Sequence, residues 1–280
     1  MARLPVKKTY KLYVGGAFPR SESGRTYEAE GQNVARASRK DARDAVVAAR
    51  GAVAGWSGMT AYNRGQVLYR IAEMLESRRV DLAAICTGKA EVERAIDRWV
   101  WYAGWADKLA QVLGGSNPVA GPYFNFTFPE PTGVVAVVAP EEPPLLGLTS
   151  RLAPVLVGGN TAVVVASETR PLAAVELGEV LATSDVPGGV VNVLTGRTAE
   201  VAPWLASHMD VNAIDLAGAA GAEGVAWGDL EAAAADNVKR VLRPAGTGPE
   251  AVEPDWTAVP DPGRMRAFLE IKTVWHPKGT

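Results

Sequence analysis

The sequence has 280 residues, of which 48% are hydrophobic, and a net charge of -2 from 29 basic and 31 acidic side chains. This length and apolar content are sufficient for one large domain or two small ones with a substantial core. The low net charge provides no long-range field that would attract nucleic acid or an anionic membrane, so neither is expected as a partner.

The first third of the chain predicts helices. Alanine and valine recur at helical spacing over residues 41–56, and an apolar stripe with the same spacing runs through residues 63–86. Residues 91–113 carry four aromatic side chains, which we interpret as helix packing rather than a ligand cage, and stop at the helix terminator GGSNP. We therefore expect the first 115 residues to be mostly helical.

After Pro131, short β-branched runs alternate with helix-like segments. Continuous apolar strands in such an alternation are typical of a parallel sheet that is covered by helices on both faces. The predicted fold class is α/β, with N-terminal helices and a Rossmann-like parallel sheet. The expected strands are GVVAVVA at 133–139, TAVVVAS at 161–167, VVNVLTG at 190–196, NAIDLAG at 212–218 and NVKRVL at 237–242.

Two further segments alternate in the manner of half-exposed antiparallel strands, PYFNFTF at 122–128 and FLEIKTVW at 268–275. We expect them to pair as a small two-stranded arm, formed by residues 121–130 and 264–280. Residues 245–263 are rich in proline, which disfavours regular structure, so they are interpreted as an extended linker.

The order of these segments resembles the aldehyde dehydrogenase superfamily, from Leu12 to about Gly246 and again from Met265 to Pro277. EPTGVVAVVAP, LVGGNTAVVVASETRPL and VPGGVVNVLTG are similar to the first three strand regions of that family. The resemblance covers about half of a full-length member. It implies an NAD-binding-like domain at 1–120 and 131–244 and an oligomerisation arm, with the proline-rich linker in place of the catalytic cysteine domain.

The resemblance also identifies degenerate catalytic positions. The first strand of the family ends in Pro-Trp-Asn-Phe-Pro-Leu, whose asparagine holds the oxyanion, and here Glu142 takes the asparagine position. Loss of one oxyanion donor typically costs about 100- to 1000-fold in rate, and a carboxylate would also repel the oxyanion. Pro244 aligns with the general-base glutamate, and the cysteine domain has no counterpart. No catalytic residue is therefore assigned.

The adjacent pair Glu141 and Glu142 admits a second interpretation, as a general acid and base. Adjacent residues of an extended segment point in opposite directions and do not share one substrate, so we favour a solvated former site.

The cofactor motifs are also incomplete. The family pattern Lys-Pro-Ser/Ala-Glu appears as Val165, Ala166, Ser167 and Glu168, without the lysine, and the Phe-Thr-Gly-Ser-Thr turn appears as LAGAA at 216–220. A helix N-terminus at that turn would still attract an anion. NAD or NADP binding is thus possible but weakened, at the vestigial positions Pro140, Ser167, Glu168, Gly218 and Ala219.

The remaining reactive side chains favour structural roles. Cys86 lies on an apolar helix face without a nearby histidine, so core packing is expected, and His208 and His276 lack the partners that a metal site needs. A single cysteine fits a reducing compartment, the N-terminus lacks a signal-peptide core, and the longest aliphatic run is too short to cross a bilayer. We expect a cytoplasmic protein without a metal.

The predicted function follows from two expectations: the chain has the oligomerisation arm, and it lacks the catalytic residues that the resemblance would require. In the family this arm adds its strands to the catalytic domain of a neighbouring subunit. We therefore expect a non-catalytic subunit that binds a full-length aldehyde dehydrogenase and stabilises or regulates it. The alternatives are an NAD(P)-binding oxidoreductase with residual or partner-dependent activity, and a degraded gene product without a role. The expected interface residues are Phe124, Phe126, Phe128, Leu269, Ile271 and Trp275.

Overall fold

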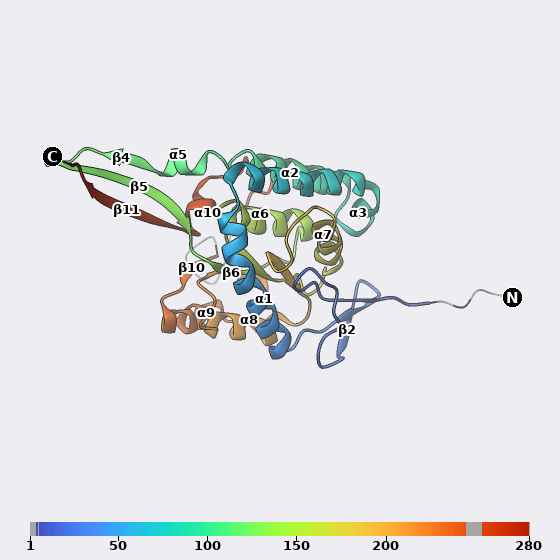
Figure 1. Ribbon diagram of the computed structural model, residues 1–280. Coiled ribbons are helices and arrows are strands. Elements are labelled where there is room, and N and C mark those ends of the chain that lie inside the picture. The colour runs from blue at the N-terminus through green and yellow to red at the C-terminus, as the bar shows by residue number, and fades with distance from the viewer. Residues whose placement is uncertain (1–3, 5, 245–253, 280) are drawn as a thin grey trace.

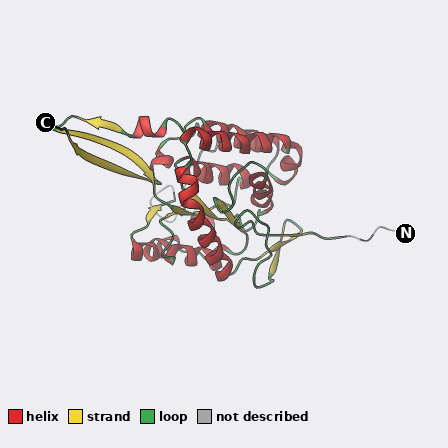
Figure 2. Cartoon of the chain, in the orientation of Figure 1, coloured by secondary structure: helices red, strands yellow, loops and turns green. Residues whose placement is uncertain are grey.

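The computed structural model describes residue 4, residues 6–244 and residues 254–279. These residues form an α/β body from which a narrow antiparallel arm projects, at the end opposite to the N-terminus (Figure 1). Helices surround the central strands of the body, whereas the arm consists almost entirely of strands (Figure 2).

A small sheet of three strands precedes the first helix. Strands β1 (Thr9–Tyr10), β2 (Thr26–Ala29) and β3 (Gln32–Ala35) lie in the order β1-β3-β2. The β2–β3 hairpin turns at Glu30 and Gly31, which both have positive φ angles, 50° and 69°, as a two-residue hairpin turn requires. The first 115 residues are therefore less helical than expected, because these strands are too short to produce a clear alternating pattern.

Helices form most of the segment from residue 39 to residue 113. A capping box between Ser38 and Asp41 starts the first helix. The apolar segment 91–113 is divided into two helices by turns between residues 103 and 109, where the sequence predicted continuous helix. The helices are α1 (Arg39–Gly58), α2 (Ala61–Ser77), α3 (Arg79–Ile85), α4 (Lys89–Ala103) and α5 (Leu109–Leu113).

The central sheet confirms the predicted Rossmann-like layer. All five expected strands are present and parallel, in the order β10-β9-β6-β7-β8. They are β6 (Val134–Val138), β7 (Thr161–Val165), β8 (Val191–Leu194), β9 (Ala213–Asp215) and β10 (Arg240–Leu242). The connecting helices are α6 (Pro144–Val157), α7 (Leu172–Ala182), α8 (Thr198–Ser207) and α9 (Trp227–Ala234), with 3-10 turns η1 (Ala219–Gly221) and η2 (Ala235–Asn237).

The core divides into two layers, one on each face of this sheet. Alternate residues of β6 separate between them, so that Val135 and Val137 join the layer with α4, α6 and α7. Val134 and Val138 join the layer with α1 and α8. Among the described helices, none is both long and apolar enough to cross a membrane.

The arm is an antiparallel sheet to which the structure adds a third strand. Strand β5 (Tyr123–Pro131) pairs with β11 (Leu269–Pro277) over nine residues, as expected, and on its other side with the short β4 (Gly115–Asn117). The order β11-β5-β4 leaves β11 at one edge of the arm (Figure 1). The sequence of β4, GSN, has no apolar alternation from which a strand could be predicted.

Residues 245–253 of the predicted linker lie outside the described part of the chain. The rest of that segment packs on the body, because Arg98 of α4 donates to the carbonyls of Trp256 and Ala258, at 3.1 and 3.0 Å. A short helix, α10 (Gly263–Arg266), then contacts α6 before β11 begins. The described half of the linker is therefore a docked segment as well as a connection.

Candidate functional site

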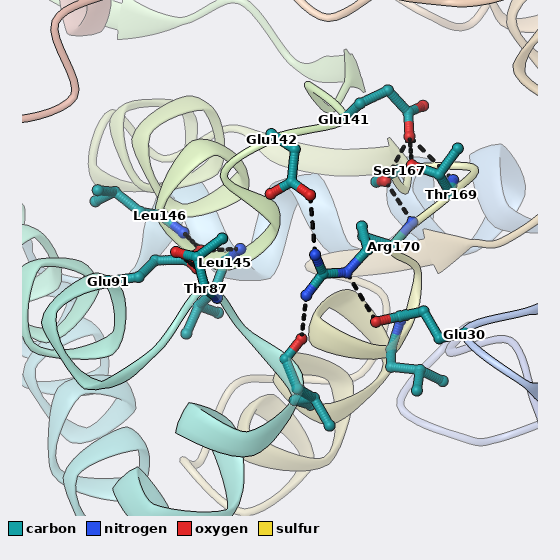
Figure 3. Close-up of polar contacts among 12 residues, drawn as sticks. Glu30, Thr87, Glu91, Glu141, Glu142, Leu145, Leu146, Ser167, Thr169 and Arg170 are labelled. Atoms are coloured by element: carbon teal, nitrogen blue, oxygen red, sulfur yellow. Dashed lines mark hydrogen bonds and ion pairs between the residues drawn. The ribbon is translucent and has the colours of Figure 1, made fainter.

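The carboxyl ends of β6 and β7 bring together two of the sequence segments that were predicted to match catalytic and cofactor motifs. In a parallel sheet these ends meet at one edge, which is where open α/β folds bind ligands. The amide of Ala139 donates to Val165 at 2.9 Å, which places the loop from Pro140 to Glu142 beside the turn that starts at Ser167. Figure 3 shows the side chains of this edge.

Glu141 is held by the turn that follows β7. Its carboxylate accepts hydrogen bonds from the hydroxyls of Ser167 and Thr169, at 2.7 and 2.6 Å. It also accepts from the amides of Glu168 and Thr169, at 3.0 and 2.9 Å. Burial raises the pKa of Glu141, but the hydrogen bonds from Thr169 and Ser167 outweigh it and leave the pKa below the ordinary value. Glu141 is thus a carboxylate that joins two strand ends.

Glu142 points away from Glu141 and forms an ion pair with Arg170, with 2.9 Å between Oε1 and Nη1 (Figure 3). The same guanidinium donates from Nε to Glu30 and from Nη2 to the carbonyl of Ile85, both at 2.9 Å. Arg170 therefore links the β2–β3 hairpin, the end of α3 and the loop after β6. The position predicted from the resemblance to match the oxyanion asparagine thus carries a carboxylate that is paired with this arginine.

A second carboxylate caps the helix that follows. Glu91 of α4 is only 5% exposed and accepts hydrogen bonds from the amides of Leu145 and Leu146, at 2.7 and 3.0 Å, in the first turn of α6. Its other oxygen accepts from the amide and the hydroxyl of Thr87, both at 2.7 Å (Figure 3). These two α6 amides are therefore satisfied by the protein itself. The sequence signal that could have identified this role is an acidic residue in the first turn of an otherwise amphipathic helix.

The predicted cofactor positions Ser167 and Glu168 are engaged within the protein. The Ser167 hydroxyl donates to Glu141 and accepts from the amide of Arg170 at 2.8 Å. One oxygen of Glu168 accepts from the amide of Thr198 at 2.9 Å, at the start of α8, and the other pairs with Arg197. The resemblance predicts a ribose contact for Glu168, whereas both of its oxygens have protein partners.

Gly218 and Ala219 lie at the switch point between β6 and β9, where the strand order reverses. The amide of Gly218 donates to the carbonyl of Val138 at 3.2 Å, and a Cβ at Gly218 would lie 2.2 Å from the carbonyl oxygen of Ala139. Ala219 begins the three-residue turn η1 and is fully buried, so the helix N-terminus expected at this turn is replaced by a 3-10 turn. Pro140 is buried against α6, where it lies close to Gly147.

The residues present at this edge do not fit a dinucleotide. Its strand ends carry the carboxylates of Glu141, Glu142 and Glu168, which repel a pyrophosphate, while Arg170 and Arg197 are both paired with acids. The turn amide of Gly218 faces a carbonyl. We therefore derive no chemical step that involves NAD or NADP.

The end of β9 carries an ion pair that the sequence did not predict. The side chain of Asp215 is fully buried and pairs with Arg264 of α10, and its other oxygen accepts from the amide of Ala217 at 2.9 Å. Because α10 directly precedes β11, this contact fixes the base of the arm against the switch point. The only signal in the sequence is an acid inside the apolar run NAIDLAG.

Among the remaining candidates, Cys86 is buried, and burial together with nearby Glu91 raises the pKa of its thiol to about 12. Such a thiol is protonated at neutral pH and is a weak nucleophile. His208 follows α8, and its Nδ1 accepts from the amide of Asp210 at 3.2 Å. Pro244 is buried just after β10, and His276 lies exposed near the tip of the arm.

The expected interface residues divide between the two faces of the arm. Directly opposed residues of an antiparallel pair share a face, and Phe126 lies opposite Val274 while Thr127 lies opposite Thr273. The three phenylalanines therefore occupy one face, and Ile271 and Trp275 occupy the other. Phe124 and Trp275 are each 59% exposed. Leu269 is only 2% exposed and contacts the body at Gly158, so it anchors the arm instead of forming an open interface.

The family model described as the aldehyde dehydrogenase family matches residues 25–256. Retinal dehydrogenase 2 of Gallus gallus is 35% identical over 277 residues, which cover 90% of this chain and 51% of the relative. Aldehyde dehydrogenase, cytosolic 1, of Elephantulus edwardii is 32% identical over 84% of this chain and 50% of its own length.

Solved structures agree with these relatives. The structure of HpcC from Thermus thermophilus matches with a TM-score of 0.78 and 29% identity, over 84% of this chain and 47% of the other. The NAD+ complex of aldehyde dehydrogenase from Bacillus cereus matches with a TM-score of 0.77 and 25% identity, over 84% and 50%. The chain thus spans about half the length of the relatives that it matches, and it belongs to the aldehyde dehydrogenase family.

Proposed function

We propose that this protein is a non-catalytic subunit that binds a full-length aldehyde dehydrogenase through its arm and stabilises or regulates it. The observation that carries the proposal is the combination of a fully formed, exposed arm with a site whose polar groups are engaged by one another. A chain of this kind retains the means of association without the means of catalysis.

The site supports the non-catalytic part of this proposal. Oxyanion stabilisation needs donors that point at the developing negative charge, and Glu142 supplies an anion that is paired with Arg170. A covalent mechanism needs an accessible thiolate, whereas the Cys86 thiol is buried with a raised pKa. Pro244, at the position of the general base, has no group that transfers a proton.

The arm supports the associating part. Among the described residues no strand pairs with the outer edge of β11, so this edge is open to another sheet beyond the buried Leu269. Long open edges are ready templates for strand addition. Trp275 on this strand and Phe124 on the neighbouring β5 have exposed aromatic side chains, which are typical of interface anchors because they bury large apolar area at low entropic cost.

The proposal is tested by capture from native lysate with a tagged chain, followed by mass spectrometry of the retained proteins. The parent chain is expected to retain a full-length aldehyde dehydrogenase, and Thr273→Pro is expected to lose it, because proline removes an N–H from the open edge. Thr273→Val, which keeps this N–H, is the matched control and is expected to retain the enzyme. A parent chain that retains no aldehyde dehydrogenase would exclude the proposal.

The alternative function, a nicotinamide-nucleotide binder with residual activity, has weaker support. The family fold favours it, but the Glu168 carboxylate and the Gly218 amide are bonded within the protein. Titration calorimetry with NAD and with NADP tests it directly, and saturable binding with measurable heat would favour it over the first proposal.

A further inference from the structure

We propose that, in the absence of another partner, two copies of this chain pair through the outer edges of their β11 strands, antiparallel and about a two-fold axis at Thr273. The two arms would then form one continuous six-stranded sheet, as a strand order of β4-β5-β11 in each copy implies. This inference concerns the free chain and stands independently of the aldehyde dehydrogenase partner.

The hydrogen bonds of the arm determine which backbone groups point outward. Thr132 donates to the carbonyl of Phe268, and Lys278 donates to the carbonyl of Pro122, so residues 268 and 278 are hydrogen-bonded positions of the β5–β11 ladder. These positions alternate along an antiparallel pair, so the even-numbered residues of β11 bond to β5. The odd-numbered residues, including Ile271, Thr273 and Trp275, therefore direct their N–H and C=O groups to the open edge.

Pairing about Thr273 places the outward N–H and C=O groups of the two copies opposite each other, and it also brings their exposed apolar side chains into contact. Odd residues then face odd residues, with Thr273 opposite its own copy and Ile271 opposite Trp275 of the second copy. Ile271 and Trp275 are 43% and 59% exposed in the single chain, and each would bury apolar area against the other. On the opposite face, Glu270 would lie across from His276, so no like charges oppose each other.

The neighbouring registers are less favourable. A two-fold axis at Lys272 would place the two Lys272 ammonium groups directly opposite each other, which is destabilising across a strand pair. An axis at Val274 would place Lys272 opposite His276 and leave the two apolar residues unmatched, with Ile271 opposite Pro277. The axis at Thr273 centres the pairing on residues 271–275 of β11, and it leaves the buried Leu269 and Pro277, which has no N–H, at the two ends.

A single pair of edge strands is a small interface, of the size that is typical of weak and exchangeable association. Because one edge accepts one strand, the homodimer and the complex with an aldehyde dehydrogenase would exclude each other. Self-pairing would then protect the edge of the free chain from unspecific strand addition and would be displaced by a partner that binds more tightly.

The register is tested by disulfide formation under mild oxidation, with the buried Cys86 retained in all variants. Hydrogen-bonded antiparallel partners have Cα atoms about 5.5 Å apart, within the range that a disulfide spans. We expect Thr273→Cys to form a covalent dimer on its own. Ile271→Cys is the matched control, because its own copy would lie four residues away along the strand, roughly 13 Å. It is expected to cross-link only when mixed with Trp275→Cys.

Association without cross-linking is measured by sedimentation and native mass spectrometry. We expect a concentration-dependent dimer for the parent chain and a monomer for Thr273→Pro, which keeps the β5 ladder because the lost N–H points outward. A parent chain that stays monomeric while Thr273→Cys fails to cross-link would overturn the inference. Equal cross-linking of Ile271→Cys alone and Thr273→Cys alone would also overturn it. A parent chain that forms the homodimer but captures no aldehyde dehydrogenase would exclude the proposed function and would leave this inference standing.

Discussion

The adjacent residues Glu141 and Glu142 are expected to differ sharply in their contributions to stability. Glu141→Gln leaves one oxygen for the three donors that contact Oε2, but it places an amide NH2 against the Glu168 N–H that now bonds Oε1. Hydrogen bonds to a charged group contribute about 1.5–3 kcal/mol each, and neutral ones about half of that. With a discount for the partial exposure of Glu141, the expected loss in the free energy of unfolding is about 2–3 kcal/mol.

Glu142→Gln is the matched control at the next residue. The side chain of Glu142 is 51% exposed and its ion pair is with Arg170, which keeps its contact with Glu30 in the variant. Exposed ion pairs contribute about 0–1 kcal/mol, so the expected loss is below about 1 kcal/mol.

Urea unfolding of the parent chain and both variants, monitored by tryptophan fluorescence, measures these losses. The pH dependence gives an independent check. Hydrogen bonds lower the folded pKa of Glu141 below its ordinary value of 4.5, so the ionised form contributes stability above that pH. The contribution is lost as pH falls through the lowered folded pKa, and the difference between the parent chain and Glu141→Gln should shrink in acid.

Equal losses for the two variants at neutral pH would refute the assignment of Glu141 as the carboxylate that joins the strand ends. A difference between the parent chain and Glu141→Gln that grows in acid would refute the direction of the pKa shift.

Three further predictions concern Glu142, Cys86 and Gly218. Glu142→Asn alone should give no aldehyde oxidation above the blank in an NAD(P)H absorbance assay, because Pro244, which the resemblance predicts at the general-base position, cannot accept a proton; measurable turnover would contradict this. The Cys86 thiol, whose pKa is raised to about 12, should react with a thiol reagent only as fast as the protein unfolds, and rapid labelling of the folded chain would disagree. Gly218→Ala places a Cβ 2.2 Å from a carbonyl oxygen and should destabilise the fold by about 3 kcal/mol or more, whereas Gly221→Ala, with no atom within 4 Å, should be nearly neutral in the same denaturation assay.

The central sheet could be predicted because its strands are continuous apolar runs. A run such as TAVVVAS is short, rich in β-branched residues and buried on both faces, as a strand of a covered parallel sheet is. The pairing of β5 with β11 was predictable for a related reason, since the segments 122–128 and 268–275 each alternate as half-exposed strands do. The strand β4 and the N-terminal sheet have two to four residues per strand, which is too short for periodicity to distinguish them from loops.

The fold class and the residue types at the strand ends could be predicted from the sequence, because each depends on local pattern or on residue type. The sequence did not determine what those residues contact. Glu91, Arg170 and Arg264 are far along the chain from the Leu145 amide, Glu30 and Asp215 that they bind. Folding brings such groups within hydrogen-bond distance, and the folded structure shows that Glu141 joins the ends of β6 and β7.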